Sequence, residues 1–295
     1  MTNESTVVLS FLVCTLNRDK DLRRSVSAIC RADNNEIVFQ IVVVDQGQSA
    51  IAAEICAEFN VVYISSASRG LSCARNIGLT HCKGEFVALM DDDAYISDTY
   101  FLKIKELLGH ANKMLLGAFS GRIMTIENPL KPLSRYQDSE RKHVMLKNMD
   151  VVLSSALVIR KSIFSKLGNF DEVFGVGARW GGSEETDLLV RILSSGSSVE
   201  YFPSLIVYHP MENFSAMCYK DILNKTYTYG LGRGALLRKH ETLPKSFIFS
   251  ALAKPAAALI LSLVLFRSKH SARYCSSLVG RVTGFIKYKS SDYTN

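Results

Sequence analysis

The sequence has no C-x-x-C pair and no cysteine–histidine cluster at the spacing of a zinc site. Its seven cysteines are an odd number, which argues against a disulfide framework as well. We therefore expect reduced thiols that pack as small hydrophobic side chains in a cytosolic protein. Prolines are few, 6 among 295 residues, and 47% of the residues are hydrophobic, so collagen-like structure and wholesale disorder are excluded.

Glycine-rich phosphate-binding signatures are also missing. The chain contains no G-x-G-x-x-G and no G-x-x-x-x-G-K-[ST], so neither a dinucleotide-binding protein nor a P-loop protein is indicated. The first residues, Met1–Thr6, are polar and lead directly into an apolar stretch, without the charged-then-apolar order of a signal peptide. We expect a protein that is not exported, and the length of 295 residues predicts one large or two modest domains.

Acidic residues are scarce near the C-terminus. From Leu231 onward, 11 Lys and Arg residues stand against two acids, Glu241 and Asp292, for a net charge of +9. Because the whole chain carries +7, the preceding 230 residues carry −2. The positive charge is therefore a property of the tail, where it suits either anionic lipid or nucleic acid.

One long hydrophobic run lies within this basic tail. It favours anionic lipid over nucleic acid as the partner. Ser246–Phe266 carries a single charge, Lys254, and just reaches the roughly 20 residues of a membrane span. Because Lys254-Pro255 near the middle disfavours a span, we expect two half-helices in one leaflet, with their headgroup contacts made by Arg267, Lys269 and Arg273. A buried hairpin of a soluble domain is the alternative, and a true span is less favoured than either. We predict that residues 246–289 bind an anionic membrane surface and that nucleic acid is not a partner.

Apolar strand-like runs alternate with helical patterns along the first half of the chain. Strands are expected at 7–15, 37–45, 61–64 and 85–90, and helices at 19–31, 50–59 and 70–81. This alternation is typical of a parallel α/β sheet. In the less regular second half, strands are expected at 118–124, 152–160 and 199–208, and helices at 184–195 and 217–240.

Three adjacent aspartates, Asp91, Asp92 and Asp93, directly follow the strand expected at 85–90. Ligands of parallel α/β sheets collect at the carboxyl ends of the strands, and adjacent carboxylates repel one another unless a positive group is bound. A divalent cation, Mg²⁺ or Mn²⁺, that also binds a diphosphate would suit such a cluster. The alternative is a solvated acidic turn that caps the next helix.

Polar side chains at the ends of neighbouring elements are candidates for the same crevice. Thr15, Asn17 and Arg18 follow the first strand, and Asp45 ends the second. Arg75 lies in the first turns of the helix expected at 70–81, where donors meet phosphate or a base edge. Each of these residues also has an ordinary interpretation, as part of a turn, a helix cap or a surface helix.

Carboxylates also begin the helix expected at 184–195, after a glycine-rich loop at 175–182. Glu184 and Asp187 share one helix face, whereas Glu185 points elsewhere. One of the three is a candidate catalytic base, although the helix dipole by itself favours acids at this position.

There are two further candidates: one precedes these carboxylates in the sequence, and the other ends the last expected strand. Trp180, the only tryptophan, stands beside Gly181 and Gly182 and offers a ring face for a sugar, or else a core side chain. His209 ends the strand expected at 199–208, where it is a candidate third metal ligand or a structural histidine.

These elements, in this order, resemble family 2 glycosyltransferases with the GT-A fold, which use nucleotide sugars. The resemblance covers about residues 6–210 and rests on CTLNR at 14–18, VVVD at 42–45, GLSCARNIG at 70–78, the aspartate triplet, SEETDL at 183–188 and His209. It implies a Rossmann-like mixed α/β sheet flanked by helices, in a catalytic domain over 1–240. A basic amphipathic helical tail that associates with the membrane would follow over 241–295.

The resemblance also implies roles for individual residues. Thr15, Asn17 and Arg18 would line the nucleotide pocket, and Asp45 would bind the base. Arg75 would lie near the base or the diphosphate, with Asp92 by the ribose. Asp91 and Asp93 would form the D-x-D pair that holds Mn²⁺ or Mg²⁺, Asp93 being the direct ligand, and His209 would complete the metal shell. Trp180, Gly181 and Gly182 are expected to contact the acceptor or the sugar.

Two departures from the family pattern limit these roles. The catalytic base is expected at Glu185, where the family has an aspartate, so Glu184 and Asp187 stay open as alternatives. The turn after Asp45 is Gln46-Gly47-Gln48-Ser49 rather than an acidic D-G-S, which leaves the identity of the bound base open.

The implied reaction is a single displacement. A metal ion would neutralise the departing diphosphate while Glu185 takes the proton of an acceptor hydroxyl, so the sugar is transferred with inversion. We expect a UDP-sugar donor and a lipid-linked oligosaccharide acceptor in surface polysaccharide synthesis, such as O-antigen or capsule. The enzyme would be peripheral or monotopic on the cytoplasmic face of the membrane. The alternatives are a dTDP-rhamnose-dependent rhamnosyltransferase of the same fold, a nucleotidyltransferase and a non-catalytic sugar-nucleotide-binding protein.

Overall fold

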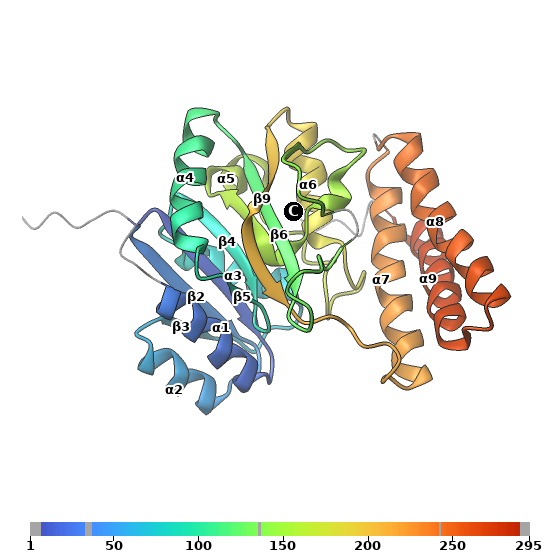
Figure 1. Cartoon of the computed structure of the whole chain (residues 1–295), viewed down its shortest axis with the longest axis horizontal. Coiled ribbons are helices and arrows are strands. Elements are labelled where there is room, and N and C mark those ends of the chain that lie inside the picture. Colours follow the sequence, from blue (N-terminus) through green and yellow to red (C-terminus); the bar gives the residue numbers. More distant parts are fainter. Residues whose placement is uncertain (1–6, 33–36, 135–136, 242, 290–295) are drawn as a thin grey trace, which may run out of the picture. The chain divides into compact units, whose positions relative to one another are not determined.

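The computed structural model describes residues 7–32, 37–134, 137–241 and 243–289 (Figure 1). The polar segment Met1–Thr6, on which the expectation of a non-exported protein rests, lies outside the described residues. The chain forms two compact units that are interleaved in sequence. The first comprises Met1–Arg69, Cys73–Asn169 and Arg191–Met211, and the second comprises Gly70–Ser72, Phe170–Val190 and Glu212–Asn295.

A mixed sheet of nine strands, counted over the described residues, forms the centre of the first unit. Its order is β3-β2-β1-β4-β8-β6-β9-β5, and β7 pairs with β9 outside this path. The strands are β1 (Leu9–Thr15), β2 (Phe39–Asp45), β3 (Val62–Ser65), β4 (Phe86–Asp91), β5 (Tyr95–Ile96), β6 (Ala118–Thr125), β7 (Lys142–His143), β8 (Leu157–Arg160) and β9 (Val199–His209). The predicted fold class, a mixed α/β sheet flanked by helices, is confirmed.

The parallel half of the sheet is the part that the sequence pattern predicts best. Strands β3, β2, β1 and β4 pair in parallel, and their bounds lie within two residues of those expected. They are linked by α1 (Asp19–Ala32), α2 (Ala50–Glu58) and α3 (Leu71–His81). In this register Thr15 lies opposite Asp45, and Cys14 lies opposite Asp91, so three strands end at one edge of the sheet.

The other half of the sheet is irregular, and the sequence analysis describes it less well. Strand β8 runs antiparallel to both β4 and β6, whereas β9 runs parallel to β6. The strand expected at 152–160 is shorter, because Ser154–Ala156 form a turn of 3₁₀-helix before β8.

Helix α4 (Tyr100–Lys113) was not expected, although its sequence carries the signal of an amphipathic helix. Its buried side chains recur at helical spacing: Tyr100, Phe101, Ile104, Leu107, Leu108 and Ala111. They join the core of the first unit, in which Phe11 contacts Tyr100 and Phe101 edge-on or tilted. Helix α5 (Ser162–Leu167) follows β8.

The second unit contains the start of α6 (Glu184–Ser194) and three long helices, α7 (Tyr219–Lys239), α8 (Lys245–Val264) and α9 (Ser268–Lys287), of which α9 packs against both others (Figure 1). Glycines let α7 and α9 touch backbone to backbone. A methyl group at Gly234 would collide with the backbone oxygen of Arg281, and one at Gly284 with that of Leu231. Small residues four apart on both helices are typical of such close crossings.

The structure corrects one expectation about the tail: Ser246–Phe266 does not form two half-helices. It lies almost entirely in α8, which is one continuous helix through Pro255. Proline has no N–H, so the carbonyl of Ala251, four residues earlier, loses its helical partner. Arg281 of α9 supplies a replacement, because its Nη1 donates to the Ala251 oxygen. Continuity of α8 therefore depends on a tertiary contact.

This contact predicts an energetic coupling between Arg281 and Pro255. Arg281→Met should lower the free energy of unfolding by about 2 kcal/mol, the worth of a hydrogen bond from a charged donor. In a Pro255→Ala background the restored N–H can bond to Ala251, so the same substitution should cost at least about 1 kcal/mol less. Urea denaturation of the four variants measures the difference. Arg267→Met, at an exposed arginine of the same tail, should change stability by under about 0.5 kcal/mol. Equal costs in both backgrounds would contradict the coupling.

Candidate active site

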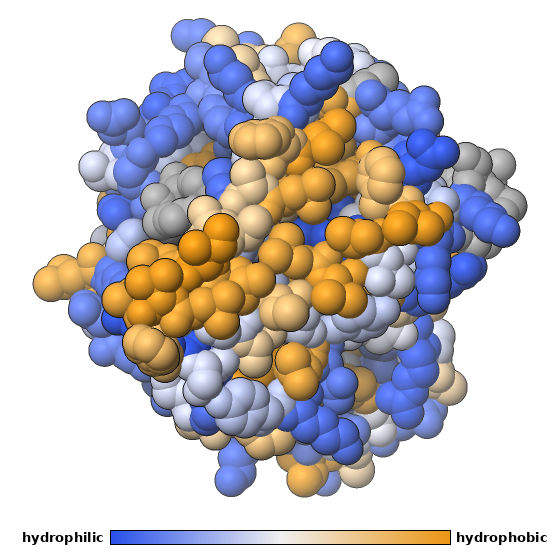
Figure 2. All heavy atoms as spheres, turned by 90° about the vertical axis from the view of Figure 1, so that its right-hand side faces the viewer, coloured by the Kyte–Doolittle hydropathy of each residue, from blue (hydrophilic) through white to orange (hydrophobic). Residues whose placement is uncertain are grey.

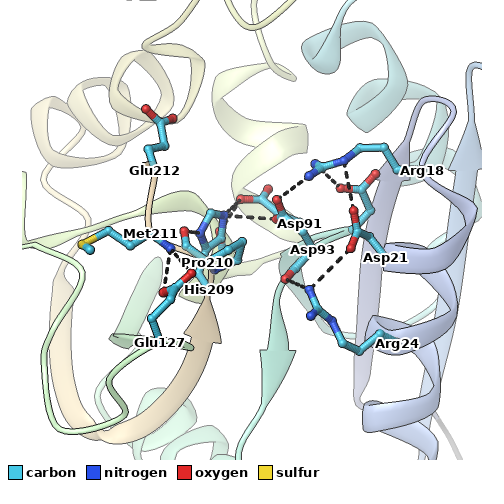
Figure 3. A network of polar contacts seen from close by, with 12 residues as sticks. Arg18, Asp21, Arg24, Asp91, Asp93, Glu127, His209, Pro210, Met211 and Glu212 are labelled. Carbon is cyan, nitrogen blue, oxygen red and sulfur yellow. Dashed lines mark hydrogen bonds and ion pairs between the residues drawn. The ribbon is translucent and has the colours of Figure 1, made fainter. Parts of the chain in front are cut away.

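The candidate site lies at the carboxyl ends of β1, β2 and β4, where the sheet register gathers Thr15, Asp45 and Asp91. The two residues after β4, Asp92 and Asp93, form the turn that leads to β5. Figure 3 shows Asp91 and Asp93 between His209, at the end of β9, and two arginines, Arg24 in α1 and Arg18 just before that helix. All of these residues belong to the first compact unit.

His209 reaches the aspartates because of the strand pairing. The short strand β5, just after the triplet, pairs antiparallel with the end of β9, so that Tyr95 lies opposite Tyr208. His209 Nε2 consequently lies 3.2 Å from Asp93 Oδ1 and 3.6 Å from Asp91 Oδ2. Potential ligand atoms of these three residues all lie within 4.8 Å of one another.

Arginine and hydroxyl groups surround the triplet. Arg18 binds two of the aspartates, with Nη1 2.8 Å from Asp92 Oδ1 and Nη2 2.7 Å from Asp93 Oδ2. Thr15 Oγ1 donates to Asp92 Oδ2 at 2.8 Å. The buried Arg75 lies 3.7 Å from Asp91 Oδ1 through its Nη2. The structure thus brings Thr15, Arg18 and Arg75, which the sequence singled out, into contact with the aspartate triplet.

Three other residues contact this cluster without having been predicted. Arg24 Nη2 donates to the backbone oxygen of Asp93 at 3.2 Å, and Asp21 forms ion pairs with both Arg18 and Arg24. Ser155 Oγ donates to Asp91 Oδ2. The i, i+3 spacing of Asp21 and Arg24 was a visible signal in the sequence, whereas the position of Ser155 follows only from strand pairing.

The pKa values of these groups depend on one another. Burial acts to lower the pKa of His209, but the close contacts and negative charges of Asp91 and Asp93 outweigh it and raise the pKa to about 10. Burial acts to raise the pKa of Asp93, yet His209 and Arg18 hold it well below its usual range. Burial and the adjacent carboxylates raise the pKa of Asp92 to about 6, against the opposing contacts of Thr15 and Arg18. A cation that binds His209 Nε2 must therefore displace a proton.

The residues present fit a hard divalent cation. The cluster offers two carboxylates and an imidazole, a ligand set that Mn²⁺ accepts and that leaves positions for diphosphate oxygens. Asp93 Oδ1 is buried and accepts no hydrogen bond from the described residues, although His209 lies nearby. A buried carboxylate oxygen that accepts no hydrogen bond is available to coordinate a metal ion.

Asp45 has a different environment. It is fully buried, and its two oxygens accept bonds from the backbone amides of Gly47 and Ser49, both at 2.7 Å. Tyr63 donates a third bond at 3.0 Å. This is the bonding of a turn carboxylate, the alternative that the sequence left open. Asn17, with a φ of 57°, lies against Gly47, where its side chain would collide with any added methyl group.

The predicted carboxylates of α6 belong to the second compact unit and differ in accessibility. Asp187 is fully buried, and its Oδ1 lies 2.7 Å from both Lys239 Nζ and His240 Nε2. Glu184 is also buried. Glu185 is half-buried, and its Oε1 accepts a bond from the adjacent Thr186 at 3.1 Å.

Trp180, Gly181 and Gly182 are buried parts of the same unit. The Trp180 ring packs against Tyr288 with a centroid distance of 5.7 Å, in a cluster with Phe174. The tryptophan thus occupies the core position that the sequence analysis kept as the alternative. Its indole Nε1 has no hydrogen-bond partner among the described residues.

Comparison with known sequences identifies related proteins. The sequence profile described as "Glycosyl transferase family 2" matches residues 10–168. A pre-mycofactocin glycosyltransferase of Mycobacterium tuberculosis is 30% identical over 151 residues, which cover 48% of this chain and 30% of that protein. The succinoglycan biosynthesis protein ExoM of Rhizobium meliloti is 23% identical over 250 residues, which cover 80% and 77%. The chain thus spans less than a third of the mycobacterial relative.

Solved structures share the fold. The mannosyltransferase PcManGT of Pyrobaculum calidifontis, solved with GDP-Man and Mn²⁺, aligns with a TM-score of 0.64 at 15% identity, over 95% of this chain and 88% of that one. Residues 1–349 of TarS of S. aureus, solved with UDP-GlcNAc, align with a TM-score of 0.59 at 14% identity, over 96% and 93%. The likeness confirms the GT-A fold. Since the family profile also covers more than half of the sequence, the chain belongs to glycosyl transferase family 2.

Proposed function

We propose that this protein is an inverting, metal-dependent glycosyltransferase that moves a sugar from a nucleotide diphosphate sugar to a hydroxyl of an oligosaccharide. The observation that carries the proposal is the cluster of Asp91, Asp93 and His209 at the carboxyl ends of the sheet strands, in a chain that belongs to family 2. The neighbours solved with UDP-GlcNAc and with GDP-Man and Mn²⁺ support a nucleotide-sugar donor and a divalent cation.

In this proposal the first unit binds the donor. Asp91, Asp93 and His209 would hold Mn²⁺ or Mg²⁺, which when bound stabilises the negative charge of a diphosphate leaving group. Arg18 and Arg75 add positive charge beside the same carboxylates, where they can pair with phosphate oxygens. The nucleotide would lie along Thr15, Asn17 and Asp45, with Asp92 toward its ribose. A UDP-sugar is the favoured donor.

We assign the catalytic base to Glu185. A base must be accessible and must not already be neutralised by a fixed cation. Asp187 fails both conditions because it is fully buried and paired with Lys239, and Glu184 is buried as well. The half-buried Glu185 would take the proton of the acceptor hydroxyl, whose oxygen attacks the anomeric carbon as the diphosphate leaves. An α-linked donor would give a β-glycoside, and a β-linked donor such as dTDP-rhamnose would give an α-glycoside.

The acceptor and the location follow from the tail. The similarity to ExoM, named for succinoglycan biosynthesis, supports a role in polysaccharide synthesis, for which we propose O-antigen or capsule. A basic tail with a long hydrophobic helix would hold the enzyme at the cytoplasmic face of the membrane, where a lipid-linked acceptor is anchored. The division into a catalytic domain, 1–240, and a membrane-associating tail, 241–295, stays part of this proposal.

A donor-release assay tests the function. The purified protein is incubated with UDP-, GDP- and dTDP-sugars in Mn²⁺ or EDTA, and free nucleoside diphosphate is measured. Release from one donor, abolished by EDTA, is expected, and the preferred nucleotide would separate the UDP-sugar proposal from the rhamnosyltransferase alternative. Calorimetry with UDP, GDP and dTDP in Mn²⁺ accompanies it. Release of pyrophosphate from a nucleoside triphosphate and a sugar phosphate would identify a nucleotidyltransferase, and absence of binding to all three nucleotides would refute the donor site.

A further inference from the structure

One side of α8 and the turn that follows it expose large apolar side chains. They include Phe249, Ile260, Leu261, Leu263, Val264 and Phe266. Figure 2 shows hydrophobic side chains gathered in a continuous band on the face of the molecule that it views. Exposed apolar patches of this kind mark contact surfaces for a partner or a membrane.

Helix α8 is not the core helix of a soluble fold. By length and composition it is able to cross a membrane, yet only 22% of its most hydrophobic 18-residue window is buried. Its other side is attached to α9 at two places. Arg281 donates to the Ala251 carbonyl, and Ser262 Oγ lies 3.0 Å from Ser271 Oγ. The polar attachments therefore orient α8 and leave its apolar side outward.

The backbone conformation and the exposure of Phe266 are both unfavourable for the stability of the folded protein. It follows the C-cap of α8 with a φ of 50°, in the left-handed region that favours glycine, and 94% of its surface is exposed. A glycine at this place would fit the backbone better and would avoid an exposed ring. A strained and fully exposed phenylalanine at a helix end is explained if the ring has a partner outside the protein.

Exposed positive charge surrounds the apolar side chains. Lys245 and Lys254 lie on α8, and Arg267 follows Phe266. Lys287 ends α9 and Lys289 lies two residues beyond it; all five are exposed. Hydrophobic residues bordered by lysine and arginine are complementary to a leaflet of anionic phospholipid. A second copy of this chain would bring the same positive charges together, which disfavours self-association through this face.

We propose that α8 and Phe266 insert into the headgroup region of an anionic phospholipid leaflet, with α8 lying in the membrane plane. A spanning orientation would place Lys254, near the helix middle, at the bilayer centre and would break the attachments to α9. The inference sharpens the membrane placement proposed above by naming the surface and its orientation. It is tested without any sugar donor, so its failure leaves the proposed transfer reaction untouched.

Flotation of the full chain with vesicles of phosphatidylglycerol and phosphatidylethanolamine tests the proposal. Binding should be strong to these vesicles, weak to phosphatidylcholine alone, and reduced by salt. Phe266→Gly should raise the melting temperature, because it relieves the left-handed residue, and should weaken vesicle binding roughly tenfold or more. A variant that is more stable and yet binds vesicles more weakly cannot owe its weaker binding to a folding defect. Ile260→Ser, at an exposed position, should weaken binding similarly.

Leu115 provides a matched control. It follows the C-cap of α4 with a φ of 52° and is 79% exposed, so Leu115→Gly should also raise the melting temperature. Because Leu115 lies in the first unit, the change should leave vesicle binding unaltered. Unchanged binding of Phe266→Gly, or no binding of the unmodified chain to anionic vesicles, would overturn the proposal. So would a dimer, measured by sedimentation, that Phe266→Gly dissociates.

The orientation has its own readout. Tryptophan introduced at Leu252, near the middle of α8, or at Phe266 is quenched by lipids brominated at defined depths, over the constant signal of the buried Trp180. In-plane insertion predicts similar, shallow quenching at both positions. Deep quenching at Leu252 with shallow quenching at Phe266 would instead show a spanning helix.

Discussion

Asp93→Asn should lower metal-dependent turnover by about a hundredfold to a thousandfold, the loss seen when one group that stabilises transition-state charge is removed. The substitution keeps the size of the side chain but replaces a carboxylate oxygen, which lies 3.2 Å from His209 and accepts no hydrogen bond from the described residues. Binding of Mn²⁺, titrated in the absence of donor, should weaken in parallel. Turnover with a panel of donors and calorimetry with Mn²⁺ measure the two effects.

Asp98→Asn is the matched control for this variant. Asp98 is exposed and lies five residues further along the same segment, so its substitution should change neither turnover nor Mn²⁺ binding. Thermal unfolding of Asp93→Asn shows whether the cluster still folds, since Asp93 also binds Arg18. A folded Asp93→Asn protein with unaltered turnover would exclude Asp93 as a metal ligand.

Glu185→Gln should lower kcat by about 10²- to 10⁴-fold, the usual contribution of a general base. Because Glu185 is not among the proposed donor-binding residues, the dissociation constant of the nucleotide should change little. The amide keeps the shape of the side chain and can still accept the bond from Thr186. Transfer to an acceptor hydroxyl, together with nucleotide binding by calorimetry, separates the loss of chemistry from a loss of binding.

The two neighbouring acids serve as controls with different expected outcomes. Glu184→Gln should retain much more activity than Glu185→Gln. Asp187→Asn should chiefly lower stability, by about 3 kcal/mol, because it removes a buried negative charge that lies 2.7 Å from the ammonium group of Lys239. If Asp187→Asn stays fully stable and loses turnover while Glu185→Gln keeps it, the base has been assigned to the wrong residue.

Local pattern accounts for the parallel half of the fold. The alternation of apolar strands and amphipathic helices predicts β1–α1–β2–α2–β3–α3–β4, because burial on both faces and helical spacing leave a direct trace in neighbouring residues. The same reasoning passed over α4, although Tyr100, Ile104 and Leu108 have helical spacing. It also extended β8 by several residues, since apolar residues on both sides of the 3₁₀ turn Ser154–Ala156 resemble one continuous strand.

The acidic triplet at the end of β4, the carboxylates that begin α6 and the charge of the tail were determined by the sequence itself, because each is a matter of which residues are adjacent along the chain. Only the tertiary structure decided which distant groups meet them. The pairing of β5 with β9 brings His209 to Asp91 and Asp93, and packing within the second unit brings Lys239 to Asp187. Arg281 keeps α8 continuous where Pro255 alone predicted a break. Such partners are set by strand pairing and helix packing, whose contacts lie far apart in sequence and leave no local pattern.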